Sequence, residues 1–130
     1  DHCIAMIGDA IVKDAPGFDY EEAYTLMRKN AFEANPDSNS YRDGKGRRAM
    51  ESYLKYNYVP LEDQVMDAFH RREQVSRTLE YAYDDYCIAQ AAKALGKTDD
   101  YRYFLSRSLS YQTLIDPETK YMRGRDSQGN

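Results

Sequence analysis

The sequence predicts an all-α fold built from helical hairpins. Apolar residues recur at helical spacing in several separate stretches, and Gly or Pro ends most of them. The longest stretch, 74–95, is apolar on nearly every side, which is typical of a helix that lies inside a structure. Only the short link 96–98 separates it from the next predicted helix, so we expect the two to lie antiparallel and adjacent.

The first half of the chain contains two predicted helices and two connections. Asp19 begins a segment that resembles a capping box, and apolar residues at helical spacing continue from there until Pro36. Residues 37–46 are polar and rich in turn formers, which predicts a loop. A shorter helix is expected over 47–56, and 59–72 has no clean periodicity, which predicts a long connection.

The second half contains the central pair. The longest helix is expected to run from about 74 to 95, and the next, capped by Asp99, to about 114. Arg107 and other polar residues give the second helix an amphipathic pattern with a polar outer face. Because the link is short, apolar residues of the two helices are expected to bury one another. They are Leu79, Tyr86, Ile88 and Leu95 in the first helix and Phe104, Leu105 and Leu109 in the second.

Ionisable residues interrupt the apolar surface of the helix 74–95. A buried carboxylate is costly unless it is paired, hydrogen-bonded or next to water. The first half of this helix is therefore predicted either to line a polar pocket or to hold a structural network. In the first case Glu80, Asp84 and Asp85 face the pocket. In the second, Arg77 holds Glu80 or Asp84 at helical spacing.

Composition argues against several classes of protein. The formal charge of −4 disfavours a nucleic-acid-binding surface, and no apolar run reaches the length of about 18 residues that spans a membrane. Two histidines and two cysteines in unrelated segments make no transition-metal pattern, so no metal ligand is assigned. The 13 tyrosines lie mostly at helical spacing, which predicts core positions rather than sugar stacking.

Longer strings of the sequence carry a family resemblance. HCIAMIGDAIVKDAPGFDYEEAY and GRRAMESYLKYNYVPLEDQ are followed by VSRTLEYAYDDYCIAQAAKALGK, DDYRYFLSRS and DPETKYMRGRDSQGN. Together they resemble the catalytic domain of glycoside hydrolase family 92, the calcium-dependent exo-acting α-mannosidases, over residues 1–130. The sequence departs from the family at Lys120, where glycine is usual, and at Ile4 and Ala5, which replace a commoner aromatic and proline pair.

The resemblance implies part of an (α/α)6 toroid, in which the inner helix of each pair lines a central cleft. Residues 1–130 would be a partial catalytic domain of a larger, secreted or periplasmic enzyme, and a fragment of this kind is expected to be inactive alone. The parent enzyme would remove terminal α-linked mannose by calcium-dependent inverting hydrolysis. The expected partners are a mannose-containing glycan and the remainder of the parent polypeptide, and the calcium ligands are expected mainly outside this chain.

The resemblance assigns no catalytic acid or base to this chain. In the family these residues belong to motifs of the form TEGN and NDD, and neither string occurs here. Glu80 and Asp84 lie one helical turn apart and project from the same wall, unlike the opposed carboxyl groups of an inverting glycosidase. Substrate-binding or cleft-lining roles are expected instead for Glu80, Asp84 and Asp85, and for Arg123 and Arg125 on a loop. The alternative for the two arginines is pairing with helix-end carboxylates.

His2 and Asp9 are predicted to lie on a loop that could also bind substrate. The competing function is a protein-binding module, because residues 91–118 imitate one tetratricopeptide-like helix pair. No second copy occurs about 34 residues upstream, where an array of such repeats would require one.

Overall fold

The computed structural model describes residues 2–63 and 71–130. Its elements, in chain order, are α1 (His2–Val12), α2 (Tyr20–Asn30), α3 (Ser38–Arg42), α4 (Met50–Tyr56), α5 (Gln74–Ala94), α6 (Thr98–Ser108) and the 3-10 helix η1 (Leu109–Leu114). The described ranges contain no β-strand, only an isolated antiparallel bridge between Ile115 and Met122. The predicted all-α class is confirmed.

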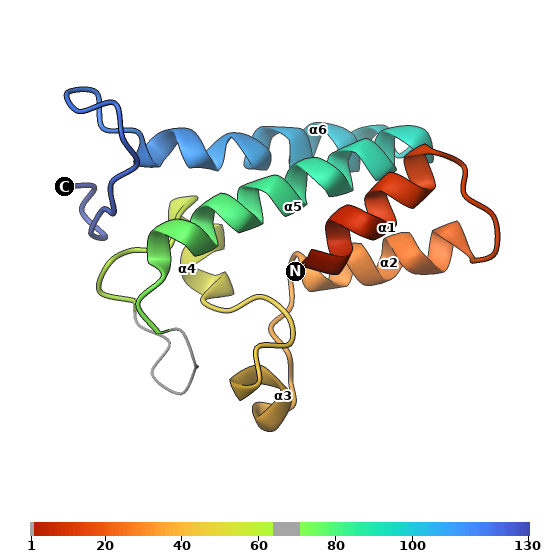
Figure 1. Ribbon diagram of the computed structural model, residues 1–130, viewed down its shortest axis with the longest axis horizontal. Helices are drawn as coiled ribbons and strands as arrows, with labels where there is room; N and C mark the ends of the chain where they lie inside the picture. Colours follow the sequence, from red (N-terminus) through yellow and green to blue (C-terminus); the bar gives the residue numbers. More distant parts are fainter. Residues whose placement is uncertain (1, 64–70) are drawn as a thin grey trace.

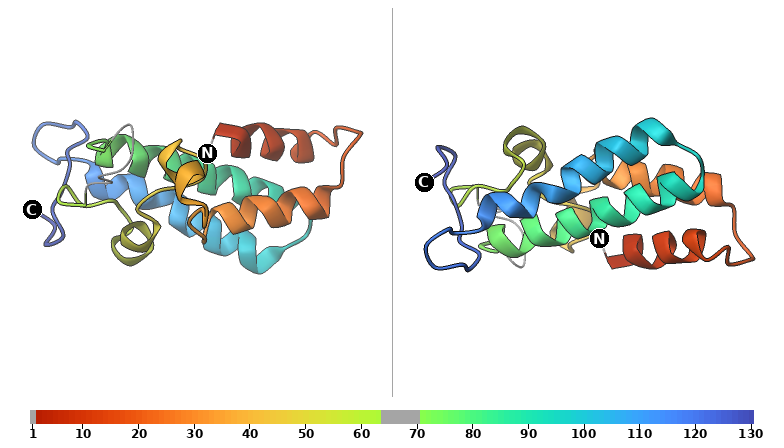
Figure 2. Two further views of the ribbon diagram at one scale, coloured as in Figure 1. Left: turned by 90° about the horizontal axis from the view of Figure 1, so that it is seen from below. Right: turned by 90° about the horizontal axis from the view of Figure 1, so that it is seen from above.

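The long helix α5 is the centre of the molecule. α1, α5 and α6 lie side by side, and α2 packs against the same central helix (Figures 1 and 2). Gly8 lets α1 come close, because a Cβ atom at this position would lie 3.1 Å from the backbone oxygen of Cys87. The core is made of buried side chains from these elements, including Ile4 and Ile11 of α1, Met27 of α2, Ile88 and Ala92 of α5, and Phe104 of α6.

Several predicted elements are present with shifted ends. Asp19 caps α2 as expected, since its side chain accepts hydrogen bonds from the backbone N–H groups of Glu21 and Glu22 at 2.9 and 3.0 Å. The helix predicted over 47–56 begins only at Met50, because Ala49 adopts a left-handed conformation with φ of 53°. The predicted connection 59–72 lies partly outside the described residues.

Other expectations are wrong. His2 and Asp9 lie on α1 rather than on a loop, because Ile4, Gly8 and Ile11 form one buried face of a helix. The predicted loop 37–46 contains the short helix α3. The side chain of its N-cap residue, Asp37, accepts a hydrogen bond from the backbone N–H of Ser40, which stabilises the start of the helix.

The helix after α5 also differs from the prediction at both ends. Lys97 is its N-cap residue and makes no side-chain cap, so Asp99 is not the cap but lies in the first turn, where its charge favours the helix dipole. Past Ser108 the backbone tightens into η1.

The predicted burial in the α5–α6 pair is partly confirmed. Ile88 and Phe104 are fully buried, whereas Tyr86 and Leu109 are 47% and 48% exposed. The last two point into a groove between α5 and α6 instead of into the core. Arg107 was expected on the polar outer face but is buried at 6% exposure, because it forms an ion pair with the buried Asp85.

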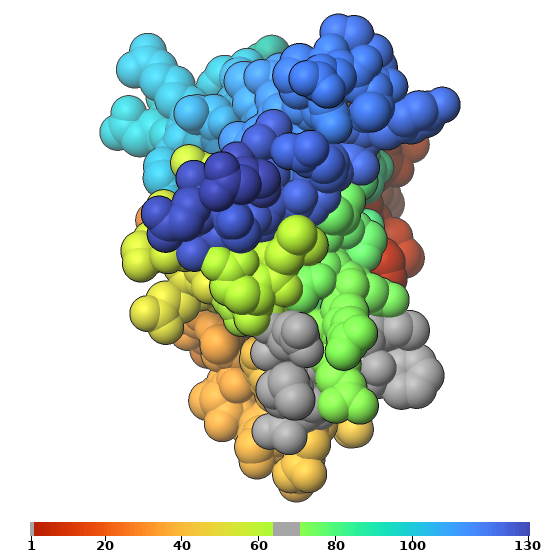
Figure 3. Space-filling view, turned by 90° about the vertical axis from the view of Figure 1, so that its left-hand side faces the viewer, coloured from red at the N-terminus to blue at the C-terminus, as the bar shows by residue number. Residues whose placement is uncertain are grey.

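The C-terminal segment lies against the chain just before the undescribed residues (Figure 3). The backbone N–H of Leu61 donates to the carbonyl of Arg125 at 2.9 Å, and the Tyr58 hydroxyl donates to the carbonyl of Asp126 at 2.7 Å. Lys120 adopts a left-handed φ of 64°, a conformation that glycine occupies more easily. The sequence departs from the family pattern at this position, where glycine is usual.

Candidate functional site

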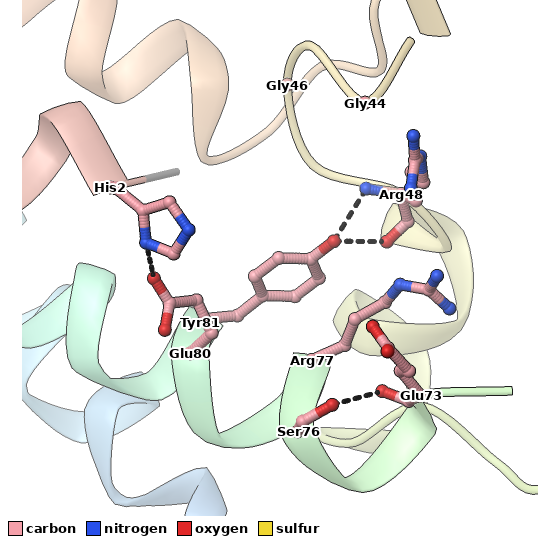
Figure 4. A pocket seen from close by; sticks show the side chains of 9 residues that line it. All are labelled: His2, Gly44, Gly46, Arg48, Glu73, Ser76, Arg77, Glu80 and Tyr81. Atoms are coloured by element: carbon pink, nitrogen blue, oxygen red, sulfur yellow. Dashed lines mark hydrogen bonds and ion pairs between the residues drawn. The ribbon is translucent and has the colours of Figure 1, made fainter. Parts of the chain in front are cut away.

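A hollow of about 280 Å³ opens beside the first half of α5 (Figure 4). We call it the polar hollow, because acidic and basic side chains face each other across it. Its lining comes from three parts of the chain: the start of α1, the segment before α4, and the first two turns of α5. The residues are His2, Gly44, Gly46, Arg48, Glu73, Ser76, Arg77, Glu80 and Tyr81.

Of the three carboxylates predicted to bind substrate or line the cleft, Glu80 is the one that lines this hollow. Its Oε1 lies 2.7 Å from Nδ1 of His2, and the two side chains are 35% and 90% exposed. Figure 4 shows the imidazole pointing down onto the carboxylate from α1. Because both groups contact solvent, they are accessible to a polar ligand. The predicted role of Glu80 in binding substrate stays a prediction.

Tyr81 joins α5 to the opposite wall of the hollow. Its hydroxyl accepts a hydrogen bond from the backbone N–H of Arg48 at 2.7 Å and donates one to the carbonyl of the same residue at 3.0 Å. Arg48 in turn donates to the carbonyls of Tyr41 and Arg42 at 3.1–3.2 Å. Burial raises the pKa of the Tyr81 phenol, so the hydroxyl keeps the proton that it donates.

Asp85 lies behind the hollow and is saturated with hydrogen bonds. Its Oδ1 accepts from Nη1 of Arg47 at 2.7 Å and from Nη2 of Arg107 at 2.8 Å. Its Oδ2 accepts from Nε of Arg107 at 2.6 Å and from the Tyr53 hydroxyl at 3.0 Å. The bidentate contact with Arg107 is the strong, directional kind of ion pair. Since Asp85 is 0% exposed, this geometry identifies a structural anchor.

Arg107 is held on every side. Besides Asp85, its Nη2 donates to the carbonyl of Ala31 at 3.0 Å, at the end of α2. Burial alone would lower the pKa of its guanidinium, but the hydrogen bonds to Asp85 raise it, so the group stays charged. Aromatic rings pack around the guanidinium with centroids 5.0–5.6 Å away, a cation–π arrangement. They belong to Phe32, Tyr53, Tyr103 and Phe104.

Asp84 has a different environment. It is also 0% exposed, but neither of its oxygens accepts a hydrogen bond from the residues that the structure describes. Within the described residues it forms an ion pair with Nη2 of Arg47, which lies 3.7 Å from Oδ2, too far for a hydrogen bond. Burial raises the pKa of the Asp84 carboxyl to about 7, although Arg47 pulls it down. A substantial fraction of Asp84 is therefore protonated at neutral pH.

Arg123 and Arg125 lie in the C-terminal segment and do not line the polar hollow. Nη1 of Arg123 is 3.6 Å from Oδ2 of Asp116, the carboxylate pairing that the sequence left open as the alternative. Arg125 donates to the carbonyls of Thr113 and Gly129 at 2.5 and 2.7 Å. Both arginines thus make contacts within the chain, and their predicted contact with substrate stays a prediction.

The sequence reading missed the cations that surround the buried carboxylates. Arg47 belongs to a basic cluster that could equally be a solvated face, and Arg107 belongs to a helix with a polar pattern. The available signal was indirect: two adjacent carboxylates in an apolar helix require buried positive charges from elsewhere in the chain.

The described residues do not fit the calcium ion that the family resemblance implies. Within 2–63 and 71–130 no group of three or more His, Cys, Asp or Glu side chains converges to hold a metal ion. All the donors around Asp85 are positive or hydroxyl groups, and Arg47 lies beside Asp84, so a cation at either carboxylate would meet a guanidinium.

Within residues 2–63 and 71–130, no helix is long and apolar enough to cross a membrane.

Comparisons with known proteins give a consistent result. A family model described as the glycosyl hydrolase family 92 catalytic domain matches residues 1–130. A family GH92 α-mannosidase of Bacteroides thetaiotaomicron, solved in complex with mannoimidazole, is 53% identical with a TM-score of 0.81 over 99% of this chain. An inverting mannosidase of the same family and organism is 31% identical with a TM-score of 0.81 over 100% of this chain.

A curated relative shows the same similarity. An uncharacterized secreted glycosidase of Arthroderma benhamiae is 32% identical over 125 residues, which is 94% of this chain. The chain spans only 15–16% of the length of these relatives.

Proposed function

This chain belongs to glycosyl hydrolase family 92, and from that premise we propose that it is part of the catalytic domain of an exo-acting α-mannosidase. The observation that carries the proposal is the 53% identity, over 99% of the chain, with a solved α-mannosidase of the family. The parent enzyme releases terminal α-linked mannose from glycans outside the cell or in the periplasm. We further propose that the hydrolysis is calcium-dependent and inverts the anomeric configuration.

Within that enzyme, residues 1–130 form a segment of the (α/α)6 toroid and α5 is one of its inner helices. Glu80 faces the cleft from the polar hollow, where its carboxylate and the imidazole of His2 are placed to hydrogen-bond sugar hydroxyls. Asp84 and Asp85 support that wall from behind, and Arg123 and Arg125 contribute at the cleft edge. The catalytic acid and base come from other parts of the parent polypeptide, because inverting hydrolysis needs two carboxyl groups on opposite sides of the bond.

The tetratricopeptide-like alternative is not retained. The tetratricopeptide-like pattern covers only one helix pair, residues 91–118, whereas the family model matches the whole chain.

The proposal is tested with the parent polypeptide that contains this chain. We expect it to release mannose from an α-linked mannobiose, to lose that activity in a calcium chelator and to regain it when calcium is added back. Proton NMR of the first product should show the β-anomer, the result of inversion. Residues 1–130 alone, as the control, should release no mannose. A parent protein that is folded and calcium-loaded but inactive on α-mannosides would overturn the proposed activity.

A further inference from the structure

The segment 44–49 forms one wall of the polar hollow, and α5 forms another (Figure 4). Gly44 and Gly46 adopt left-handed conformations with φ of 83° and 82°, which glycine occupies without strain. Ala49 follows in the left-handed region at φ of 53°, where its Cβ makes the backbone strained. A strained conformation of this kind persists only where the surrounding contacts hold it in place.

Tyr81 makes a contact that crosses from α5 to this wall. Its hydroxyl is hydrogen-bonded to both backbone groups of Arg48, the N–H at 2.7 Å and the carbonyl at 3.0 Å, directly before the strained Ala49. Figure 4 shows the ring spanning the distance from α5 to the segment 44–49. The residue is only 2% exposed, and its ring packs edge-on against that of Tyr53 with centroids 5.3 Å apart. A hydroxyl on a ring fixed in the core therefore sets the distance between α5 and the wall.

Arg48 connects this contact to the rest of the wall. Its guanidinium donates to the carbonyls of Tyr41 and Arg42 at the end of α3. The same group lies against Gly44, where a Cβ atom would be 2.8 Å from Nη2 of Arg48. Because the phenol holds the backbone of Arg48 and its side chain holds the preceding turn, a shift of that backbone would move the whole wall.

We propose that Tyr81 is a positioning residue, whose hydroxyl holds the segment 44–49 where the polar hollow can bind a sugar of the substrate. The inference rests on the proposed function, in which Glu80 and His2 hydrogen-bond sugar hydroxyls in the same hollow. Without the phenol hydroxyl, the buried N–H and carbonyl of Arg48 would each lose a partner, which is costly. The segment would shift to reach other partners, and relief of the strain at Ala49 favours the same shift.

Tyr81→Phe tests this role in the calcium-loaded parent polypeptide, because it removes the hydroxyl and keeps the ring. Steady-state kinetics with an α-linked mannobiose should show KM raised roughly three- to tenfold and kcat changed by less than about twofold, since the wall binds ground state and transition state alike. A residue that served stability alone would lower the fraction of folded enzyme, and with it the apparent kcat, without changing KM.

Tyr24→Phe is the matched control. Tyr24 is also buried, at 3% exposure, and its hydroxyl donates to Asp100 at 2.8 Å, but it does not line the polar hollow. This variant loses a buried hydroxyl as Tyr81→Phe does, and its KM should equal that of the wild type.

Hydrogen exchange followed by mass spectrometry gives a readout that does not require activity. The amides of peptides within 41–49 should exchange at least about tenfold faster in Tyr81→Phe than in the wild-type parent polypeptide. In Tyr24→Phe they should exchange at the wild-type rate. Unchanged exchange in Tyr81→Phe would show that the hydroxyl does not hold the wall.

The kinetic outcomes separate this inference from the proposed function. An unchanged KM in Tyr81→Phe, or an equal rise in Tyr24→Phe, would overturn the positioning role and leave the proposed activity intact. A wild-type parent polypeptide that releases no mannose would contradict the proposed function instead, and the exchange rates would still decide whether Tyr81 holds the wall.

Gly44→Ala perturbs the wall while Tyr81 stays intact. Its added methyl group crowds Nη2 of Arg48, and alanine is strained at the left-handed φ of this position. The variant should therefore also raise KM for the mannobiose. An unchanged KM would overturn the role of the wall, even if Tyr81→Phe did not fold.

Discussion

Asp84 and Asp85 are neighbours on α5 and are both fully buried, yet they differ in their surroundings. Asp85 accepts four hydrogen bonds, three of them from Arg47 and Arg107. Asp84 accepts none from the described residues and has Arg47 at 3.7 Å. Successive side chains on a helix point about 100° apart, so two adjacent carboxylates can lie in unlike environments. Burial alone therefore does not tell a structural anchor from a group with spare hydrogen-bonding capacity.

The largest effect is expected at the saturated carboxylate. Asp85→Asn removes the negative charge but keeps the size of the side chain, which leaves the buried Arg107 without its counter-ion and the buried Arg47 with only the more distant Asp84. We expect a loss of roughly 3–5 kcal/mol in the free energy of unfolding. Chemical denaturation followed by circular dichroism measures it, with Asp84→Asn as the matched control. Similar losses in both variants would remove the distinction between the two residues.

The second effect concerns pH. The folded-state pKa of Asp84, about 7, lies above the value near 3.9 of an unfolded chain, so the folded state binds the proton more tightly. The stabilisation that follows is complete below the unfolded pKa and is lost as the pH rises through about 7. Asp84 should therefore make the protein less stable at pH 8 than at pH 5, by roughly 2–3 kcal/mol.

Asp84→Asn isolates this contribution, because Asn resembles the protonated carboxyl and does not ionise. Denaturation of both proteins at pH 5 and pH 8 should show a smaller loss of stability with pH in the variant. If the stability of the wild-type protein and of the variant changed with pH in the same way, that result would contradict the raised pKa of Asp84. The carboxylate would then be ionised and its charge compensated.

A smaller loss of stability is expected when one hydrogen-bond donor to Asp85 is removed. Tyr53→Phe removes the hydroxyl that donates to Asp85 and that also contacts Ser110 at 3.0 Å. Because the two arginines still hold the carboxylate, we expect a loss of about 1.5–3 kcal/mol, the range for a hydrogen bond to a charged group. Tyr121→Phe, at a side chain that is 78% exposed, is the control and should leave the denaturation midpoint unchanged.

The smallest effect on stability is expected at Glu80, the carboxylate that faces outward. Its side chain is 35% exposed, so Glu80→Gln should change the free energy of unfolding by less than about 1 kcal/mol. In the parent enzyme the same variant should lower kcat/KM for an α-mannoside, if the side chain contacts substrate as we propose. Unchanged kinetics would show that the polar hollow does not contribute to the cleft.

Helical periodicity was enough to predict most of the core of this fold. It located α2, α4, α5 and α6, and the cap at Asp19 set the start of the first of these. It missed α1, whose sequence offers no acidic residue in the first turn and no basic residue in the last. It also predicted that Tyr86 and Leu109 lie in the core, although both are about half exposed. Apolar spacing shows which residues share a helix face, but it does not show whether another element packs on that face.

The site was predicted only in part. The costly carboxylates could be recognised from one helix, because they break a local apolar pattern. Their partners could not, since Arg47 and Tyr53 lie 38 and 32 residues before Asp85 and Arg107 lies 22 residues after it. Contacts across such separations leave no spacing signal in a single sequence. The raised pKa of Asp84 likewise depends on its burial in the folded chain, which its neighbours in the sequence do not reveal.

The same separations bear on the order in which the chain assembles. The α5–α6 hairpin closes over a short loop, and its own Arg107 supplies the bidentate bond to Asp85. Contacts of low sequence separation form at the smallest loss of chain entropy, so this hairpin is the natural folding nucleus. Arg47, Tyr53 and the carbonyl of Ala31, which lies 76 residues from Arg107, join afterwards. Substitutions within the hairpin should therefore slow folding, whereas Tyr53→Phe should mainly speed unfolding in stopped-flow measurements.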